Sequence, residues 1–151
     1  MGEKISHETR SRMMSGIRAR DTKPEKLIRS HLHAKGLRFR LCVRDLPGKP
    51  DIVLAKWRVV VLVHGCFWHG HVGCRYFRLP KTRAAFWAEK ISKNAQRDAV
   101  SLASLLELGW RVAVVWECAL RDNQLHTLDQ LSEFVRSEDG LIELASPLTS
   151  T

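Results

Sequence analysis

Two cysteines and two histidines lie within nine positions of this 151-residue chain, and a third cysteine follows a later apolar run. In order they are Cys66, His69, His71, Cys74 and Cys118. Thiolate and imidazole together suit zinc, which prefers four tetrahedral nitrogen and sulfur ligands. Cys66, His71 and Cys74 supply three ligands, and either Cys118 or His69 can supply the fourth. A closed set of four would make the zinc ion structural rather than catalytic.

A second candidate site is the carboxylate of Asp51, which opens a strand after a loop rich in Pro and Gly. We expect it to face the end of the next strand, at Val63 and His64. A Mg²⁺-dependent phosphodiesterase places its metal at such a position, because the hard cation takes oxygen ligands and stabilises the leaving oxygen. The arrangement resembles that of restriction-endonuclease-like nucleases, which usually carry Glu-x-Lys on the second strand.

This chain has neither that acid nor that lysine, because the second strand ends in Val63-His64-Gly65. Two features can compensate. The main-chain carbonyl of Val63 can bind Mg²⁺, since a backbone oxygen is a hard ligand. His64 and His69 can transfer protons, because the pKa of imidazole lies near the working pH. Asp51 together with these histidines predicts a hydrolytic site.

The elements that must position these residues follow from hydrophobic periodicity. The pattern predicts helices over 24–36, 82–108 and 127–135, and strands over 37–43, 51–55, 58–63 and 111–116. On the long helix, the apolar residues are expected to lie on one side. A strand that returns after a long helix indicates a parallel crossover. The order predicts an α/β fold with a mixed central β-sheet flanked by helices.

Charge is distributed unevenly along the chain. The first hundred residues carry 22 basic and 8 acidic side chains, a net charge of +14, whereas the remaining 51 carry 3 and 8, a net charge of −5. Concentrated positive charge attracts phosphate backbones, so we expect a nucleic-acid partner. We expect a basic N-terminal arm over 1–20, a single domain over 21–139 and a flexible tail over 140–151. With no apolar run of ~18 residues and no secretory signal, we expect a cytoplasmic protein without a membrane span.

At these residues the sequence resembles the very-short-patch repair (Vsr-type) endonucleases, bacterial enzymes that nick DNA beside T:G mismatches left by deamination of 5-methylcytosine. The similarity extends from Thr9 to Arg121, and its strongest parts are residues 46–51, 64–69, 86–94 and 109–111. It implies a restriction-endonuclease-like core and a Mg²⁺-dependent nick 5′ to the mispaired T of double-stranded DNA. It also implies a monomer associated with the bacterial nucleoid and contacts to other mismatch-repair proteins.

The resemblance implies a role for each catalytic residue. Asp51 would ligate Mg²⁺ together with the Val63 carbonyl, and Glu25 would hold an outer-shell water on the metal. His69 would be the general base or would position the attacking water. His64 would contact the scissile phosphate, and the Asp98 carboxylate would orient His64.

The resemblance also selects the fourth zinc ligand, since the implied set is Cys66, His71, Cys74 and Cys118. The aromatic residues that would wedge between base pairs are Phe67, Trp68 and Trp87. Lys90 and Asn94 would help to recognise the mispair. Met14, with the basic arm, would reach the minor groove. Trp110 and Trp116 are expected to pack in the core. The chain departs from the family at Val63, where Thr is frequent, a change that matters only if the hydroxyl acts.

Two other functions fit the same residues. The first is a restriction-type endonuclease that cuts matched duplexes on both strands, and cleavage of fully paired DNA at a comparable rate would favour it. The second is a non-catalytic, zinc-containing DNA-binding module. DNA binding that survives Asp51→Ala, with no cleavage at all, would favour the module.

Overall fold

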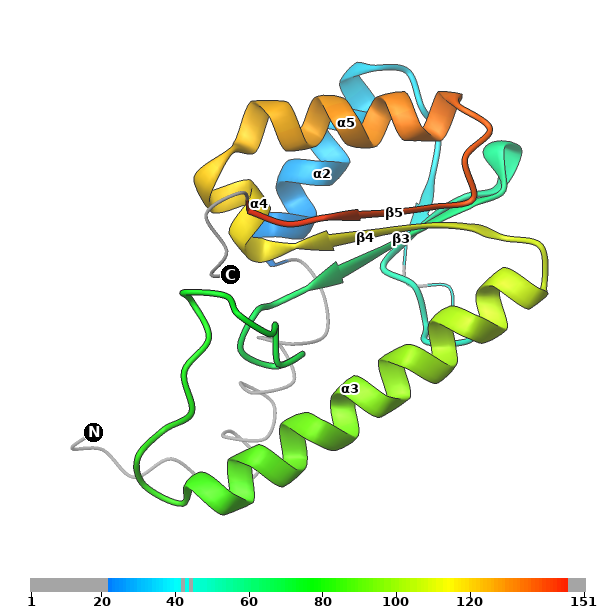
Figure 1. The fold of residues 1–151 in the computed structure, drawn as a ribbon. Helices are drawn as coiled ribbons and strands as arrows, with labels where there is room; N and C mark the ends of the chain where they lie inside the picture. The colour runs from blue at the N-terminus through cyan, green and yellow to red at the C-terminus, as the bar shows by residue number, and fades with distance from the viewer. Residues whose placement is uncertain (1–21, 42, 44, 147–151) are drawn as a thin grey trace, which may run out of the picture.

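The structure of the protein is a computed structural model that describes residues 22–41, 43 and 45–146. The basic arm over residues 1–20, Met14 included, lies outside the described residues, as do residues 147–151 of the predicted tail. Five strands form one mixed sheet with helices on both faces (Figure 1). The mixed central sheet and its flanking helices are therefore confirmed. Within the described ranges, no helix combines the length and apolar composition needed to cross a membrane.

The sheet has the order β1-β2-β3-β4-β5, antiparallel from β1 to β3 and parallel from β3 to β5. The strands are β1 (Arg40–Leu41), β2 (Ile52–Leu54), β3 (Val59–His64), β4 (Arg111–Trp116) and β5 (Leu141–Leu144). The parallel register pairs His64 with Trp116, so both strands end at the same edge of the sheet. The strand predicted over 37–43 shortens to two residues, because the Leu37 N–H donates to the Leu32 carbonyl at 2.9 Å and closes the preceding helix.

Helices cover the two faces of the sheet. They are α2 (Lys23–Ala34), α3 (Ala84–Glu107), α4 (Glu117–Asp122) and α5 (Gln124–Arg136). Ile28 of α2 and Leu131 of α5 pack in the core on one face, whereas Leu105 of α3 packs in the core on the other (Figure 1). β3 is almost wholly buried, as expected of a central strand with both faces covered.

Helix α2 begins where the sequence predicts, because two reciprocal hydrogen bonds between Thr22 and Glu25 cap its first turn. The Thr22 hydroxyl accepts from the Glu25 N–H, and the Glu25 carboxylate accepts from the Thr22 N–H, both at 3.4 Å. This capping box satisfies two N–H groups that an open helix end would leave unpaired. It also fixes Glu25, only 6% exposed, on the first turn beside the sheet.

Helix α3 confirms the long predicted helix, and most of its apolar side is exposed. Among its residues only Ile91 and Leu105 are buried, and most of the alanines are exposed. The half-buried positions follow a stripe that includes Asn94 and Asp98, one turn apart. Small residues make up most of the apolar side of α3, whereas the stripe that faces the protein carries polar side chains.

The tail predicted over 140–151 was wrong in its first part. Residues 141–144 form β5, which pairs in parallel with β4, and the Val112 N–H donates to the Gly140 carbonyl at 2.9 Å. Leu144 is buried in the core. The predicted last helix is also longer and begins at Gln124, after the short helix α4 that carries Cys118. A four-residue strand is stable here because β4 supplies its partner.

Candidate functional site

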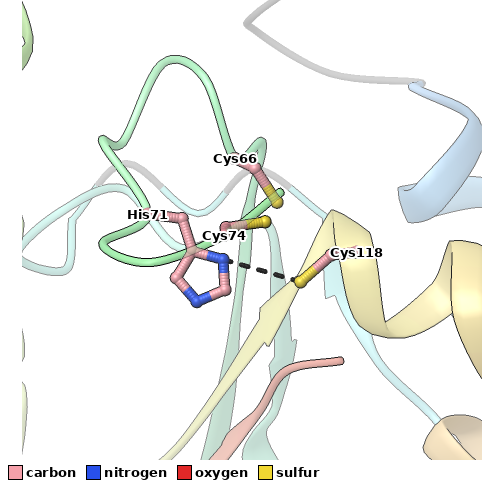
Figure 2. Close-up of side chains that lie close together, drawn as sticks. All are labelled: Cys66, His71, Cys74 and Cys118. Atoms are coloured by element: carbon pink, nitrogen blue, oxygen red, sulfur yellow. Dashed lines mark hydrogen bonds between the residues drawn. The ribbon is translucent and has the colours of Figure 1, made fainter. Parts of the chain in front are cut away.

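The loop after β3 and the first turn of α4 bring four metal-ligating side chains together. Cys66, His71 and Cys74 come from the loop and Cys118 from α4, and their ligand atoms all lie within 4.8 Å of one another (Figure 2). His71 Nδ1 lies 3.5 Å from the Cys118 sulfur. The structure therefore groups the four residues that the resemblance implies and places His69 outside them.

Backbone hydrogen bonds shape the loop around this cluster. The His71 N–H donates to the Cys66 carbonyl at 3.0 Å, and the Cys74 N–H donates to the His71 carbonyl at 3.2 Å. The Cys118 sulfur accepts from the Ser146 N–H at 3.3 Å. All four side chains are buried, and burial raises the pKa of the Cys66 and Cys118 thiols. A metal that binds here must displace these protons, and the close grouping of three sulfurs and one imidazole nitrogen is what favours such a cation.

A second cluster, His64, His69 and Asp98, lies beside the first. His69 Nδ1 lies 2.5 Å from the Asp98 carboxylate, and the rings of His64 and His69 stack with centroids 3.9 Å apart. The Asp98 carboxylate, which the resemblance pairs with His64, forms its hydrogen bond with His69 and lies within the same cluster as His64. Although burial opposes it, the bond to His69 lowers the pKa of Asp98.

His64 lies behind His69, away from solvent. Its side chain is 8% exposed, and its Nδ1 has no hydrogen-bond partner among the described residues. Burial, and then the neighbouring His69, lower the pKa of His64 to about 4. His64 is therefore neutral at neutral pH. The implied contact of His64 to the scissile phosphate stays a prediction.

The carboxylates of Asp51 and Glu25 form the third part of the site. Asp51 Oδ2 accepts from the Val63 N–H at 2.8 Å, which ties the start of β2 to the end of β3. Burial raises the pKa of Asp51 to about 7, and the Glu25 carboxylate adds to this increase, whereas the bond from Val63 opposes it. A half-buried carboxylate beside a buried one favours a cation or a shared proton between them.

A cleft of about 880 Å³ opens over these groups. Its acidic and imidazole side chains are Glu25, Asp51, His69, Asp98 and Glu117, and its basic side chains are Lys23, Lys49 and Arg97. Sequence reasoning missed Glu117, although the parallel register places it directly after Trp116, at the edge where His64 ends β3. It also missed the three basic residues, since exposed Lys and Arg have no spacing that separates a cleft from an ordinary surface.

Three aromatic side chains cluster where the loop after β3 meets α3, and two of them, Phe67 and Trp68, line the cleft. Phe67, Trp68 and Trp87 have ring centroids 5.2 to 5.9 Å apart in edge-to-face contacts, and all three are half-buried. The Asn94 amide donates to the Trp68 carbonyl at 3.1 Å, so α3 holds the loop that carries Trp68. Lys90 lies at a second hollow along α3 and not at the cleft that Asn94 lines.

The contact of this loop with α3 leads to a stability prediction at Gly70. Gly70 has φ +60°, and an added Cβ would lie 2.5 Å from Ile91 Cγ2. We expect Gly70→Ala to lower the free energy of unfolding by about 2 kcal/mol, through the left-handed φ and the overlap together. Gly36→Ala is the matched control, because Gly36 has φ +76° with no atom within 4 Å. Equal losses in denaturant melts of the two variants would contradict the contact with Ile91.

Comparisons with known proteins agree with this geometry. The family described as DNA mismatch endonuclease Vsr matches residues 3–75. The type II nicking enzyme V.XorIIP of Xanthomonas oryzae pv. oryzae is 52% identical over 122 residues, which are 81% of this chain and 89% of the relative. The DNA mismatch endonuclease Vsr of Escherichia coli K12 is 50% identical over 125 residues, 83% of this chain and 80% of the relative. The chain therefore belongs to the Vsr family, and it is a nuclease of the hydrolase class.

Proposed function

We propose that the protein nicks one strand of duplex DNA 5′ to the mispaired T of a T:G mismatch, in a Mg²⁺-dependent reaction that starts very-short-patch repair. The observation that carries the proposal is the composition of a single cleft. It holds the buried carboxylate of Glu25 beside the half-buried one of Asp51, a histidine bonded to an aspartate and two of the three clustered aromatic rings, Phe67 and Trp68. Cleavage and the recognition of an opened base step then occur in one place.

Asp51, Glu25 and the Val63 carbonyl are the groups that would hold Mg²⁺. Carboxylate and carbonyl oxygens are its preferred protein ligands, and the raised pKa of Asp51 is what a buried carboxylate beside a second carboxylate has before a cation binds. When bound, Mg²⁺ supplies positive charge for the phosphoryl oxygen and the leaving oxygen. We assign Asp51 as a direct ligand and Glu25 as the holder of an outer-shell water.

His69 is the proposed general base. The Asp98 carboxylate can only accept, so Nδ1 of His69 carries the proton of their 2.5 Å contact. That tautomer leaves Nε2 of His69 free to take a proton from the attacking water. His64 stacks on the far face of the ring and limits its rotation. We therefore assign His64 to the positioning of His69.

A prediction follows for Asp98. Asp98→Asn presents an amide that also satisfies the other His69 tautomer, so we expect the single-turnover cleavage rate to fall by roughly 10²-fold with duplex affinity little changed. Asp129→Asn is a suitable control, since Asp129 lies on α5 beside a different histidine, His31. Rapid-quench assays with Mg²⁺ and a T:G duplex measure the effect. A cleavage rate equal to that of the control variant would contradict the assignment of His69, held by Asp98, as the general base.

The Cys66, His71, Cys74 and Cys118 cluster is proposed to bind one structural zinc ion. Three sulfurs and one imidazole nitrogen make a complete tetrahedral set, with no position left for a reacting water. When bound, zinc cross-links the loop after β3 to α4. The loop carries both His69 and the aromatic residues Phe67 and Trp68, so the same cross-link would fix the groups that cut DNA and those that enter it.

The aromatic residues are proposed to enter the opened mismatch. Phe67, Trp68 and Trp87 would replace the base stacking lost at a wedged step, and a mismatched step costs least to open. Lys90 and Asn94 are proposed to recognise the mispair, and Met14 with the basic arm is proposed to reach the minor groove. Lys23, Lys49 and Arg97 at the cleft supply positive charge for the backbone.

No step of the proposed reaction needs a group from a second copy, and we propose that the enzyme acts as a monomer. The E. coli and Xanthomonas relatives are bacterial, and we accordingly propose action on DNA in the bacterial cytoplasm, with contacts to other mismatch-repair proteins.

The experiment that tests the proposal is a cleavage assay on a panel of duplexes with varied neighbours of a T:G pair. We expect a single-strand nick 5′ to the T with Mg²⁺ and little cleavage of the T:A duplexes of identical sequence. Cuts in both strands of matched DNA at a comparable rate would replace the proposal with a restriction-type activity. Tight binding without any cleavage would replace it with a DNA-binding module.

A further inference from the structure

Trp116, the last residue of β4, lies between the two histidine-containing clusters. Its ring stacks on His71 with centroids 3.9 Å apart and planes 6° from parallel. Its edge also meets the ring of His64 at 5.0 Å and 77°. Since His64 in turn stacks on His69 at 3.9 Å, four rings run in unbroken contact from the Cys/His cluster to the proposed base.

A hydrogen bond from outside both clusters fixes the indole. Trp116 Nε1 donates to the Glu143 carboxylate at 2.6 Å, and Trp116 is only 8% exposed. Glu143 lies on β5, the strand that the sequence does not predict, and β5 pairs directly with β4. The indole is therefore held by its own strand, by a neighbouring strand and by two rings, which leaves its plane little freedom.

We infer that Trp116 is a positioning residue that transmits the geometry of the Cys/His cluster to the His64–His69 pair, with Glu143 fixing its orientation. The inference rests on the proposed function for its effect on cleavage. Trp is suited to this position because its two fused rings contact His71 on a face and His64 at an edge, while its N–H reaches Glu143. Phe is shorter and has no N–H, so it cannot keep all three contacts.

The test compares Trp116→Phe with Trp110→Phe in the zinc-loaded protein. Trp110 is the matched control, because it packs at the edge of the same apolar cluster and stacks on Arg58 at 4.2 Å, away from both histidine-containing clusters. We expect Trp116→Phe to lower the single-turnover rate on a T:G duplex by ~10–100-fold, the range seen when groups behind a reacting centre are lost. Zinc content, thermal stability relative to Trp110→Phe and duplex affinity should stay nearly unchanged.

Glu143 supplies a second pair of variants. Glu143→Gln keeps an acceptor for the indole and should retain the wild-type rate, whereas Glu143→Ala should lose part of it, roughly 3–10-fold. This rescue separates positioning from a general effect on folding, because both variants remove the same charge. Equal rates for the Ala and Gln variants would overturn the role of Glu143.

Two spectroscopic measurements do not depend on cleavage. With Co²⁺ replacing zinc, the visible bands report the ligand geometry at His71, and imidazole ¹⁵N NMR reports the ring of His69. We expect Trp116→Phe to shift both signals and Trp110→Phe to shift neither. Unchanged spectra with an unchanged rate would overturn the inference, as would a rate loss that only matches a loss of bound metal. A wild type that leaves every T:G duplex intact while these spectra still shift would instead overturn the proposed function.

Discussion

Replacing Asp51 with Asn is expected to abolish DNA cleavage and, at the same time, to stabilise the metal-free protein at neutral pH. The Asn amide cannot supply the negative charge that Mg²⁺ needs, and the loss of several kcal/mol of charge stabilisation corresponds to a fall of at least ~10³-fold in rate. The amide oxygen can still accept from the Val63 N–H, the 2.8 Å bond that holds β2 to β3. The fold should therefore persist.

The stabilisation follows from the pKa of Asp51, which burial raises to about 7. In the folded protein the carboxyl group binds its proton more tightly than in the unfolded chain. Its contribution to stability is fully present below the unfolded pKa, near 4, and is lost as the pH rises through the folded pKa. The uncharged amide of the Asp51→Asn variant would not be subject to this loss. The stability advantage of the variant should start near pH 4 and level off above pH 7, at an order of magnitude of about 4 kcal/mol.

Thermal melts from pH 4 to 8 in a chelating buffer measure this difference. We expect the unfolding temperature of Asp51→Asn to exceed that of the wild type by about 5–10 °C at pH 8 and to match it near pH 4. Millimolar Mg²⁺ should raise the wild-type value and leave the variant unchanged. Asp45→Asn is the control, because Asp45 is exposed in the loop before β2. A variant that still nicks DNA, or that melts below the wild type at pH 8, would refute the assignment of Asp51.

Local signals were enough to predict the elements that hold this site. Thr22, Pro24 and Glu25 are helix-start residues, so α2 could be placed within a few positions. The apolar run that becomes β3 is continuous, which is typical of a strand covered on both faces. The cluster of Cys66, His71 and Cys74 could be predicted because three ligands lie in one loop. The family resemblance then supplied Cys118, which spacing alone left in competition with His69.

What could not be predicted depends on contacts between distant parts of the chain. Asp98 lies 29 positions from His69, and which of two adjacent histidines it contacts depends on the angle at which α3 crosses the sheet. β5 is a strand only because β4 lies beside it, and its four residues carry no strong pattern of their own. Glu143, and with it the orientation of Trp116, was missed for the same reason. The polar stripe of α3 was missed because the helix faces a cleft, whereas an apolar count assumes that a helix faces a core.

The second large effect is expected at the Cys/His cluster, where Cys118→Ala should remove the zinc ion and destabilise the whole domain. Cys118 is the only one of the four ligands outside the loop after β3, so its loss breaks the cross-link between that loop and α4. Closing the segment of chain between Cys74 and Cys118 is worth about 3–4 kcal/mol, because it lowers the entropy of the unfolded chain. That loss corresponds to a fall in unfolding temperature of about 10 °C. Metal analysis should find about one zinc per wild-type chain and far less in the variant.

A chelator provides the internal control. A strong zinc chelator should lower the unfolding temperature of the wild type close to that of Cys118→Ala and should leave the variant unchanged. Returning zinc should restore the wild type only, because the three ligands left in the variant do not reach α4. The buried Cys66 and Cys118 thiols, whose pKa values are raised by burial, would then keep their protons in the metal-free protein. If the wild type melts at the same temperature with and without the chelator, the cluster does not hold a structural metal. The hydrogen bonds within the loop and its contacts with α3 would then be what holds His69, Phe67 and Trp68 in position.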